Sequence, residues 1–165
     1  MTAAAPALTV LVATSGRGRT VRGTLQHLRA QTIADRLEVI LIGPEASSFD
    51  DLAPAETAGF AHCRRLDIGL FDEVERAFVP GIRAATAPRV ALLENHVYPE
   101  PDWAAAIVRA FEGSWSAVGS IITNANTDTA TSWVEHLMTY GRHDETARGG
   151  EVARIPRNNS AFRRD

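Results

Sequence analysis

Short apolar runs recur along the chain at spacings that suit buried strands. The clearest runs are Leu8–Thr14, Leu37–Ile42, Arg89–Glu94 and Ser116–Ile122, and a weaker one spans Ala61–Leu66. They are short, rich in leucine and β-branched residues, and nearly continuous. Such runs are typical of strands buried on both faces of a sheet.

Stripes of apolar residues three or four positions apart separate these runs and predict helices. The stripes cover Val21–Leu28, Val74–Ala85, Trp103–Phe111 and Trp133–Tyr140. Pro80 falls inside the second stripe, so we expect a kink or a restart there. In the last stripe we expect Trp133, Leu137 and Tyr140 to face the core.

In two further segments the apolar residues follow no regular spacing. Glu45–Gly59 is acidic and poor in large apolar residues, which predicts a loop with a short helix. Arg148–Ile155 is expected to form a turn and a short strand.

The alternation of strands and helices predicts an α/β fold, with an open, mostly parallel sheet flanked by helices. We expect residues 1–165 to belong to a single domain. In such sheets, ligands bind at the carboxyl ends of the strands. The segments to follow are therefore Thr14–Arg17, Gly43–Glu45 and Glu94–Tyr98.

The composition is that of a globular domain, and it argues against nucleic-acid binding and against a transmembrane segment. The chain has 165 residues, of which 45% are apolar and 22% charged, and its net charge is −3. This balance argues against a basic, nucleic-acid-binding face. No apolar run approaches the roughly 20 residues of a transmembrane helix. We expect a cytoplasmic protein, or one peripheral to a membrane.

Cysteine and arginine usage narrow the picture further. The single cysteine, Cys63, allows no intrachain disulfide, which favours a reducing compartment. We interpret Cys63 as a packing residue, with a nucleophile as the alternative. All seventeen basic residues are arginine. That reflects either a coding bias or guanidinium groups that bind phosphate or carboxylate.

The loop after the first strand contains Gly16, Arg17 and Gly18. A dinucleotide fingerprint needs a third glycine where Val21 stands, and a P-loop needs lysine where Thr24 stands. The sequence therefore argues against both kinds of nucleotide-binding loop. Backbone amides and Arg17 at a helix start still favour an anion.

A carboxylate and an imidazole follow the strand that ends at Glu94. Glu94 and His96 are two residues apart, so both can bind one divalent cation. The oxygen ligand suits Mg²⁺ or Mn²⁺, and the imidazole favours Mn²⁺. The alternative is a strand-end carboxylate paired with an arginine, beside a surface histidine.

The last ten residues, Pro156–Asp165, contain two asparagines and three arginines. Such groups can hydrogen-bond an acceptor molecule or a diphosphate. The alternative is a solvated loop at a chain end.

Taken in order, these segments resemble the family 2 glycosyltransferases, which share the GT-A fold. The resemblance rests on L-T-V-L-V-A-T-S-G-R at the first strand, L-E-V-I-L-I at the second, and G-I-R-A-A-T-A before the third. It continues through V-A-L-L-E-N-H with P-E-P-D-W, and ends with N-N-S-A-F-R-R-D. The metal motif is similar to a subgroup with Glu-x-His in place of Asp-x-Asp.

The resemblance implies a transferase that moves a sugar from a nucleotide-diphosphate donor to an acceptor hydroxyl, with inversion and a divalent cation (Mn²⁺ or Mg²⁺). The acceptor would be a glycan, a lipid-linked sugar or a small molecule. The implied roles are the metal for Glu94 and His96, the nucleotide sugar for Thr14, Ser15 and Arg17, and the acceptor side for Asn158, Asn159 and Arg163.

The chain departs from the family pattern at three places. Gly43-Pro44 replaces an acidic pair that helps to hold the base, and Phe78-Val79 replaces an Arg-Asn pair. The family's catalytic carboxylate lies beyond the acceptor motif, so we expect the chain to be an N-terminal portion of the catalytic domain. The acidic candidates Glu135, Asp144, Glu145 and Glu151 match no family motif, and no base is assigned.

Three hypotheses follow. The first is a glycosyltransferase. The second is a degenerate GT-A domain that binds a nucleotide or sugar, or serves as a scaffold, without turnover. The third is an unrelated α/β binding protein. Nucleotidylyltransferases share the topology, but their glycine-rich, lysine-bearing loop is absent from this sequence.

Overall fold

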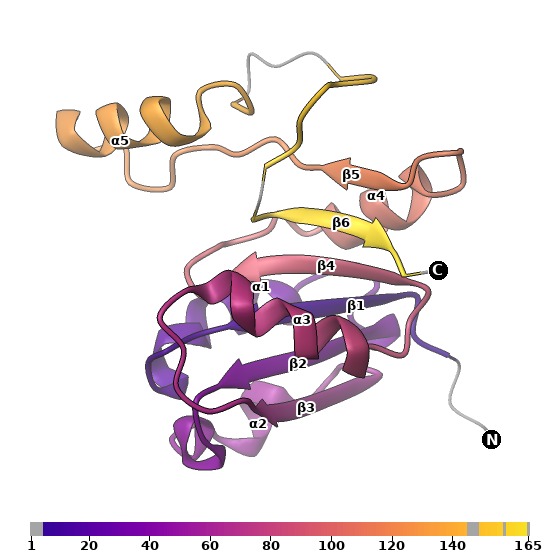
Figure 1. Cartoon of the computed structure of the whole chain (residues 1–165), viewed down its shortest axis with the longest axis vertical. Helices are drawn as coiled ribbons and strands as arrows, with labels where there is room; N and C mark the ends of the chain where they lie inside the picture. Colours follow the sequence, from indigo (N-terminus) through magenta and orange to yellow (C-terminus); the bar gives the residue numbers. More distant parts are fainter. Residues whose placement is uncertain (1–4, 145–148, 157, 165) are drawn as a thin grey trace.

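The protein is built around one six-stranded sheet, and Figure 1 shows its strands side by side. The computed structural model describes residues 5–144, 149–156 and 158–164. The strands are β1 Leu8–Ala13, β2 Leu37–Gly43, β3 His62–Asp67, β4 Arg89–Glu94, β5 Ala117–Gly119 and β6 Ser160–Arg163. Their order across the sheet is β3-β2-β1-β4-β6-β5. β1 to β4 are parallel, and β6 lies antiparallel between β4 and β5.

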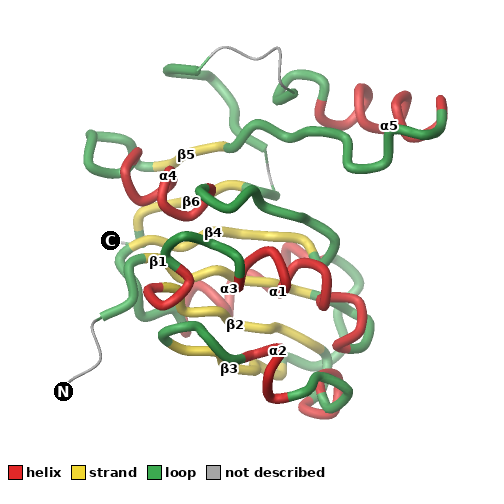
Figure 2. Tube along the Cα trace, turned by 180° about the vertical axis from the view of Figure 1, so that it is seen from behind, coloured by secondary structure: helices red, strands yellow, loops and turns green. Residues whose placement is uncertain are grey.

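Helices cover both faces of the sheet (Figures 1 and 2). They are α1 Arg22–Arg29, α2 Pro54–Thr57, α3 Val74–Ala84, α4 Trp103–Ala110 and α5 Ala130–Tyr140. Short 3₁₀ turns occur at Gly18–Val21, Ala34–Arg36 and Ala46–Phe49. α3 lies on one face, α1 and α4 pack on the other, and α5 lies apart from the main sheet, beyond β5.

Alternation along β1 explains why the sheet carries two cores. Leu8, Val10 and Val12 pack with α1 and α4 in one cluster. Leu11 and Ala13 point the other way and pack against α3. Because successive side chains of a strand face opposite sides, a continuous apolar run serves both layers. The buried strands predicted at Leu8–Thr14, Leu37–Ile42 and Arg89–Glu94 are confirmed.

A buried carboxylate ties the amino-terminal half of the sheet to the loop before β4. Glu38 on β2 is fully buried, and its oxygens accept hydrogen bonds from Thr9 Oγ1 (2.5 Å), the Thr86 N–H (2.8 Å) and the Arg64 guanidinium (2.7 Å). Burial alone would raise the pKa of Glu38. The hydrogen bonds outweigh burial, and the pKa lies below its ordinary value of 4.5.

The terminal motif is part of the sheet, which the sequence interpretation missed. Ser160–Arg163 forms β6 and not a loop, and Arg89 pairs with Arg163 while Leu92 pairs with Ser160. The strand expected at Arg148–Ile155 does not form over residues 149–155, and Arg148 lies outside the described residues. The expected strand at Ser116–Ile122 is confirmed only for its central residues Ala117–Gly119.

Of the kink or restart expected at Pro80, the restart does not occur, because Pro80 lies within α3, which runs from Val74 to Ala84. The prediction for α5 needs correction. On α5, Trp133 and Leu137 are 41% and 54% exposed, and the buried residue is His136. Trp133 and Leu137 of the predicted face therefore point outward, whereas Tyr140 lines the larger cavity described below.

Cys63 on β3 is a free, half-buried thiol, and burial raises its pKa to about 11. A thiol that stays protonated near neutral pH is a poor nucleophile, which agrees with a packing role. Among the described residues, no helix is long and apolar enough to cross a bilayer.

Candidate functional site

Polar side chains converge where β4 ends and β6 begins. Glu94, the last residue of β4, is 17% exposed, and its Oε1 accepts a hydrogen bond from Asn158 Nδ2. Its other oxygen, Oε2, lies 3.2 Å from His96 Nε2. The carboxylate is thus held between an amide and an imidazole at the carboxyl end of the parallel strands.

A chain of hydrogen bonds fixes the side chain of Asn95, which lies between these two residues in sequence. Thr20 Oγ1 donates to the Arg17 carbonyl (2.7 Å), so the hydroxyl hydrogen of Thr14 must point at Thr20 Oγ1, 3.0 Å away. Thr14 Oγ1 then accepts from the Gly16 N–H and from Asn95 Nδ2, each at 3.0 Å. All hydrogen-bonding capacity of this hydroxyl is used.

The orientation of Asn95 decides which nitrogen of His96 carries a proton. Because Nδ2 of Asn95 faces Thr14, its Oδ1 faces His96 Nδ1 at 3.0 Å. An amide oxygen only accepts, so Nδ1 donates. The lone pair of a neutral imidazole then lies on Nε2, pointing at the Glu94 carboxylate.

A divalent cation fits this arrangement. Two ligands at right angles around an ion, with bonds near 2.1 Å, lie roughly 3 Å apart. The 3.2 Å between Glu94 Oε2 and His96 Nε2 agrees with that spacing. Among the described residues no group of three or more His, Cys, Asp or Glu side chains could hold a metal ion. The remaining positions around a cation would fall to water or substrate oxygens.

Two cavities meet at Glu94 and His96. The smaller, about 200 Å³, is lined by Thr14, Ser15 and Asn95 together with the loop before α3. The larger, about 520 Å³, lies between the sheet, the segment after β5 and helix α5. Since Glu94 and His96 line both, a cation held there would contact molecules in either cavity.

One buried amide, Gln31, joins the segment that follows α1 to the loop after β4. Gln31 Nε2 donates to the carbonyls of Glu100 (2.7 Å) and Pro99 (3.4 Å), and Gln31 Oε1 accepts from the Ala104 N–H (2.9 Å). Tyr98 packs against His27, with ring centroids 5.3 Å apart. This contact holds Tyr98 at the wall of the larger cavity.

Most residues expected at the site lie together. Thr14 and Ser15 line the smaller cavity, Glu94 and His96 line both, and Asn159 lines the larger one. Asn159 is 5% exposed and has a φ of 62°, a left-handed conformation that asparagine tolerates well. Its N–H donates to the Leu92 carbonyl (2.8 Å), which ties it to β4.

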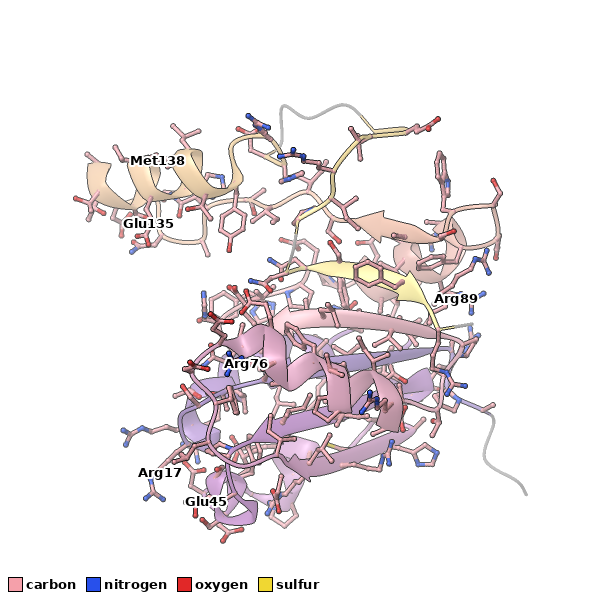
Figure 3. All side chains as sticks on the ribbon, viewed as in Figure 1. Arg17, Glu45, Arg76, Arg89, Glu135 and Met138 are labelled. Carbon is pink, nitrogen blue, oxygen red and sulfur yellow. The ribbon has the colours of Figure 1, made fainter. Side chains whose placement is uncertain are left out.

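Two predicted residues lie elsewhere. Arg163 lies at the opposite end of β6, because that antiparallel strand runs away from Glu94. Its guanidinium donates to the carbonyls of Phe111, Gly113 and Trp115 at 2.6, 2.7 and 2.9 Å. Arg17 is exposed and lines neither cavity, and Figure 3 shows it at the edge of the molecule near Glu45.

Sequence reasoning missed several lining residues. Phe71 and Asp72, in the loop between β3 and α3, line the smaller cavity. The one feature of the sequence that could have indicated them is that they follow a parallel strand. Glu135 on α5 lines the larger cavity, whereas Asp144 and Glu151 line neither and Glu145 lies outside the described residues. Arg157 also lies outside them.

No protein-family model and no curated protein matches the chain. Solved structures do. The mannosyltransferase PcManGT of Pyrobaculum calidifontis, in complex with GDP-Man and Mn²⁺, aligns over 97% of this chain and 45% of its own, with 17% identity and a TM-score of 0.60. TarS of S. aureus aligns over 96% of this chain and 47% of its own, with 13% identity and a TM-score of 0.62.

A third similar structure is glucosyl-3-phosphoglycerate synthase of Mycobacterium tuberculosis, in complex with phosphoglyceric acid. It aligns over 96% of this chain and 57% of its own, with 11% identity and a TM-score of 0.58. The chain therefore spans about half the length of the structures that it matches. At these identities the likeness establishes the fold, which is GT-A, as the sequence predicted.

Proposed function

Given a GT-A fold, we propose that the chain is the donor-binding portion of a glycosyltransferase that uses a nucleotide-diphosphate sugar and a divalent cation. The observation that carries the proposal is the pairing of Glu94 Oε2 with His96 Nε2 at 3.2 Å, where two cavities meet. A donor and an acceptor must meet at the reacting carbon, and the cavities supply one space for each.

The side chains around Glu94 have separate roles in this proposal. Glu94 and His96 would hold the cation, which when bound would stabilise the negative charge on the diphosphate leaving group. Asn158 restrains the Glu94 carboxylate, and Asn95 orients the imidazole of His96. Outer hydrogen bonds of this kind fix the ligands before the ion arrives.

We place the nucleotide in the smaller cavity and the acceptor in the larger. Ser15 lines the smaller cavity near the carboxyl end of β1, where α/β sheets bind ligands. Thr14 contributes through its hydrogen bonds to Gly16 and Asn95, since its hydroxyl has no capacity left for a ligand.

A binding experiment tests the proposal. The 165-residue chain is titrated with nucleotide sugars that carry different bases, with and without Mn²⁺, and thermal unfolding is followed. A ligand at one hundred times its dissociation constant stabilises the native state by about 2.7 kcal/mol. We expect stabilisation that requires Mn²⁺ and is lost in Glu94→Ala and His96→Ala.

Glu112→Ala provides the matched control, because Glu112 is an exposed carboxylate that lines neither cavity. It should keep the full stabilisation. The proposal fails if no donor stabilises the chain with Mn²⁺, or if Glu94→Ala retains the effect.

A further inference from the structure

Helix α5 carries its polar residues inward and its apolar residues outward. Ser132, Glu135, His136 and Thr139 share one side of the helix and line the larger cavity. Leu137 and Met138 are 54% and 83% exposed. Figure 3 shows Glu135 on the side of α5 that faces the sheet and Met138 on the outer side. A helix beside a core would have the reverse pattern, so this polar stripe serves the cavity.

Two amides among the residues that line the cavity have incompletely used hydrogen-bonding capacity. Asn159 lines the cavity and is 95% buried, yet its Oδ1 has no partner among the described residues. Asn124, on the segment after β5, likewise has an unpartnered Nδ2. Buried polar atoms without partners are rare and costly. These two amides therefore point to a ligand, or to water that a ligand displaces, with hydroxyl groups able to donate and accept.

The charges around this cavity are unfavourable to an anion. Glu94, Glu100 and Glu135 line it, and no arginine does so among the described residues. Even with a cation bound at Glu94, a phosphate or carboxylate elsewhere in the cavity would meet Glu100 and Glu135 without a guanidinium among the described lining residues to balance them. In a partly desolvated site, like charges repel by more than they do in water.

Aromatic side chains complete the lining. Tyr98 and Trp103 contribute from the loop and helix after β4, and Tyr140 from the end of α5. The Trp103 indole N–H donates to Ser120 Oγ (3.0 Å), which fixes the ring. Aromatic rings pack against the C–H faces of sugars, and the surrounding amides and hydroxyls suit the sugar's hydroxyl groups.

We infer that the larger cavity binds an uncharged, hydroxyl-rich acceptor of the sugar class, held by the polar stripe of α5 and by Asn159. The inference depends on the proposed function in one respect, which is that the bound sugar is the acceptor of the transfer. Binding of a neutral sugar in this cavity can be measured independently of donor binding. Preference for a neutral sugar would also distinguish this chain from the glucosyl-3-phosphoglycerate synthase with a similar fold, which was solved in complex with phosphoglyceric acid.

The test uses saturation-transfer NMR on the whole 165-residue chain with Mg²⁺. The neutral probes are methyl α-mannopyranoside and methyl β-glucopyranoside, and the anionic probe is 3-phosphoglycerate at the same concentration. We expect saturation transfer to at least one glycoside and none to 3-phosphoglycerate. Glu135→Ala and Thr139→Val should each raise the glycoside dissociation constant about fivefold, the effect of one lost hydrogen bond.

Two variants separate binding from folding. Glu135→Gln keeps a hydrogen-bonding group of the same shape and should bind the glycoside within about twofold of the native chain. Glu112→Ala removes a carboxylate outside both cavities and should leave binding unchanged. Binding of 3-phosphoglycerate in preference to both glycosides would overturn the inference, as would equal glycoside binding by the native chain and Glu135→Ala.

The donor titration on the same samples keeps the two proposals distinguishable. Donor stabilisation without glycoside binding refutes the acceptor inference and leaves the proposed function standing. Glycoside binding that depends on Glu135, without stabilisation by any donor, refutes the proposed function and supports a sugar-binding cavity.

Discussion

At the scale of single residues, the role of Asn95 is the least expected feature of the site. A Glu-x-His motif leaves its middle residue undefined. Here that residue joins the β1 loop to the metal motif, through Thr14 on one side and His96 on the other. Because Thr14 is 3% exposed and fully hydrogen-bonded, the amide of Asn95 has one favoured orientation.

This role predicts a metal-binding defect in Asn95→Leu. Leucine has a similar size but cannot accept the hydrogen bond that holds His96 Nδ1. The imidazole would then be free to rotate away from Glu94. We expect Mn²⁺ affinity, measured from the electron paramagnetic resonance signal of free Mn²⁺, to fall about tenfold, as for other residues that orient metal ligands.

Gln26→Leu supplies a matched control, because it removes an exposed amide from α1 away from both cavities. Its Mn²⁺ affinity should equal that of the native chain. Unchanged affinity in Asn95→Leu, with a native circular dichroism spectrum, would show that Asn95 does not position His96.

At the scale of secondary-structure elements, Glu38 joins three strands and a loop. It lies on β2, between Thr9 on β1 and Arg64 on β3, and also accepts from Thr86 before β4. Glu38→Gln should lower the free energy of unfolding by roughly 2 kcal/mol at pH 7, the range for hydrogen bonds to a charged group. Urea unfolding measures this difference.

The same carboxylate predicts a pH dependence. Its pKa in the folded state lies below the ordinary value of 4.5, so the folded protein favours the charged form. The stabilisation is therefore complete above pH 4.5 and is lost as the pH falls through the lowered folded-state pKa. The difference between native chain and Glu38→Gln should narrow below pH 4.5.

Asp50→Asn tests whether any carboxylate would behave in this way. Asp50 pairs with Arg65 at 3.0 Å, but both side chains are largely exposed. Exposed pairs contribute about 0–1 kcal/mol. If Asp50→Asn lowered the free energy of unfolding as much as Glu38→Gln, the stabilisation could not be assigned to the buried hydrogen bonds of Glu38.

The elements show where sequence reasoning succeeds. β1, β2 and β4 were predictable because a strand buried on both faces is largely apolar. The position of Glu94 and His96 beside both cavities was also predictable, since the carboxyl end of a parallel strand is its ligand-binding end, and their binding of a metal stays a prediction. Residues in loops, such as Phe71 and Asp72, carry no such periodic signal.

β6 and α5 show where sequence reasoning fails. β6 is four residues long, and its ends are polar, so nothing in its own sequence distinguishes it from a loop. Its strand state comes from pairing with β4 and β5, which are distant in sequence. α5 was recognised as a helix, but Trp133 and Leu137 point outward and not toward a core, because periodicity reveals an apolar face without saying what lies against it.

At the scale of the whole molecule, the arrangement leaves one apolar surface uncovered. Figure 1 shows α5 projecting beyond β5, away from the main sheet. Its outer surface consists of Trp133, Val134, Leu137 and Met138, which are 41–83% exposed. Contiguous apolar surface of this kind is uncommon on monomeric proteins and favours association.

We therefore predict that the 165-residue chain self-associates through the outer surface of α5. Sedimentation velocity should show species larger than a monomer, increasing with concentration, because association removes apolar area from water. Met138→Glu combined with Leu137→Glu should restore the monomer, since two charges on this surface make burial costly. Leu70→Glu is the control, because Leu70 is 95% exposed but isolated from α5, and it should leave association unchanged. A native chain that remains monomeric at all concentrations would contradict this assignment, whereas association that persists in the double variant would place the contact on another surface.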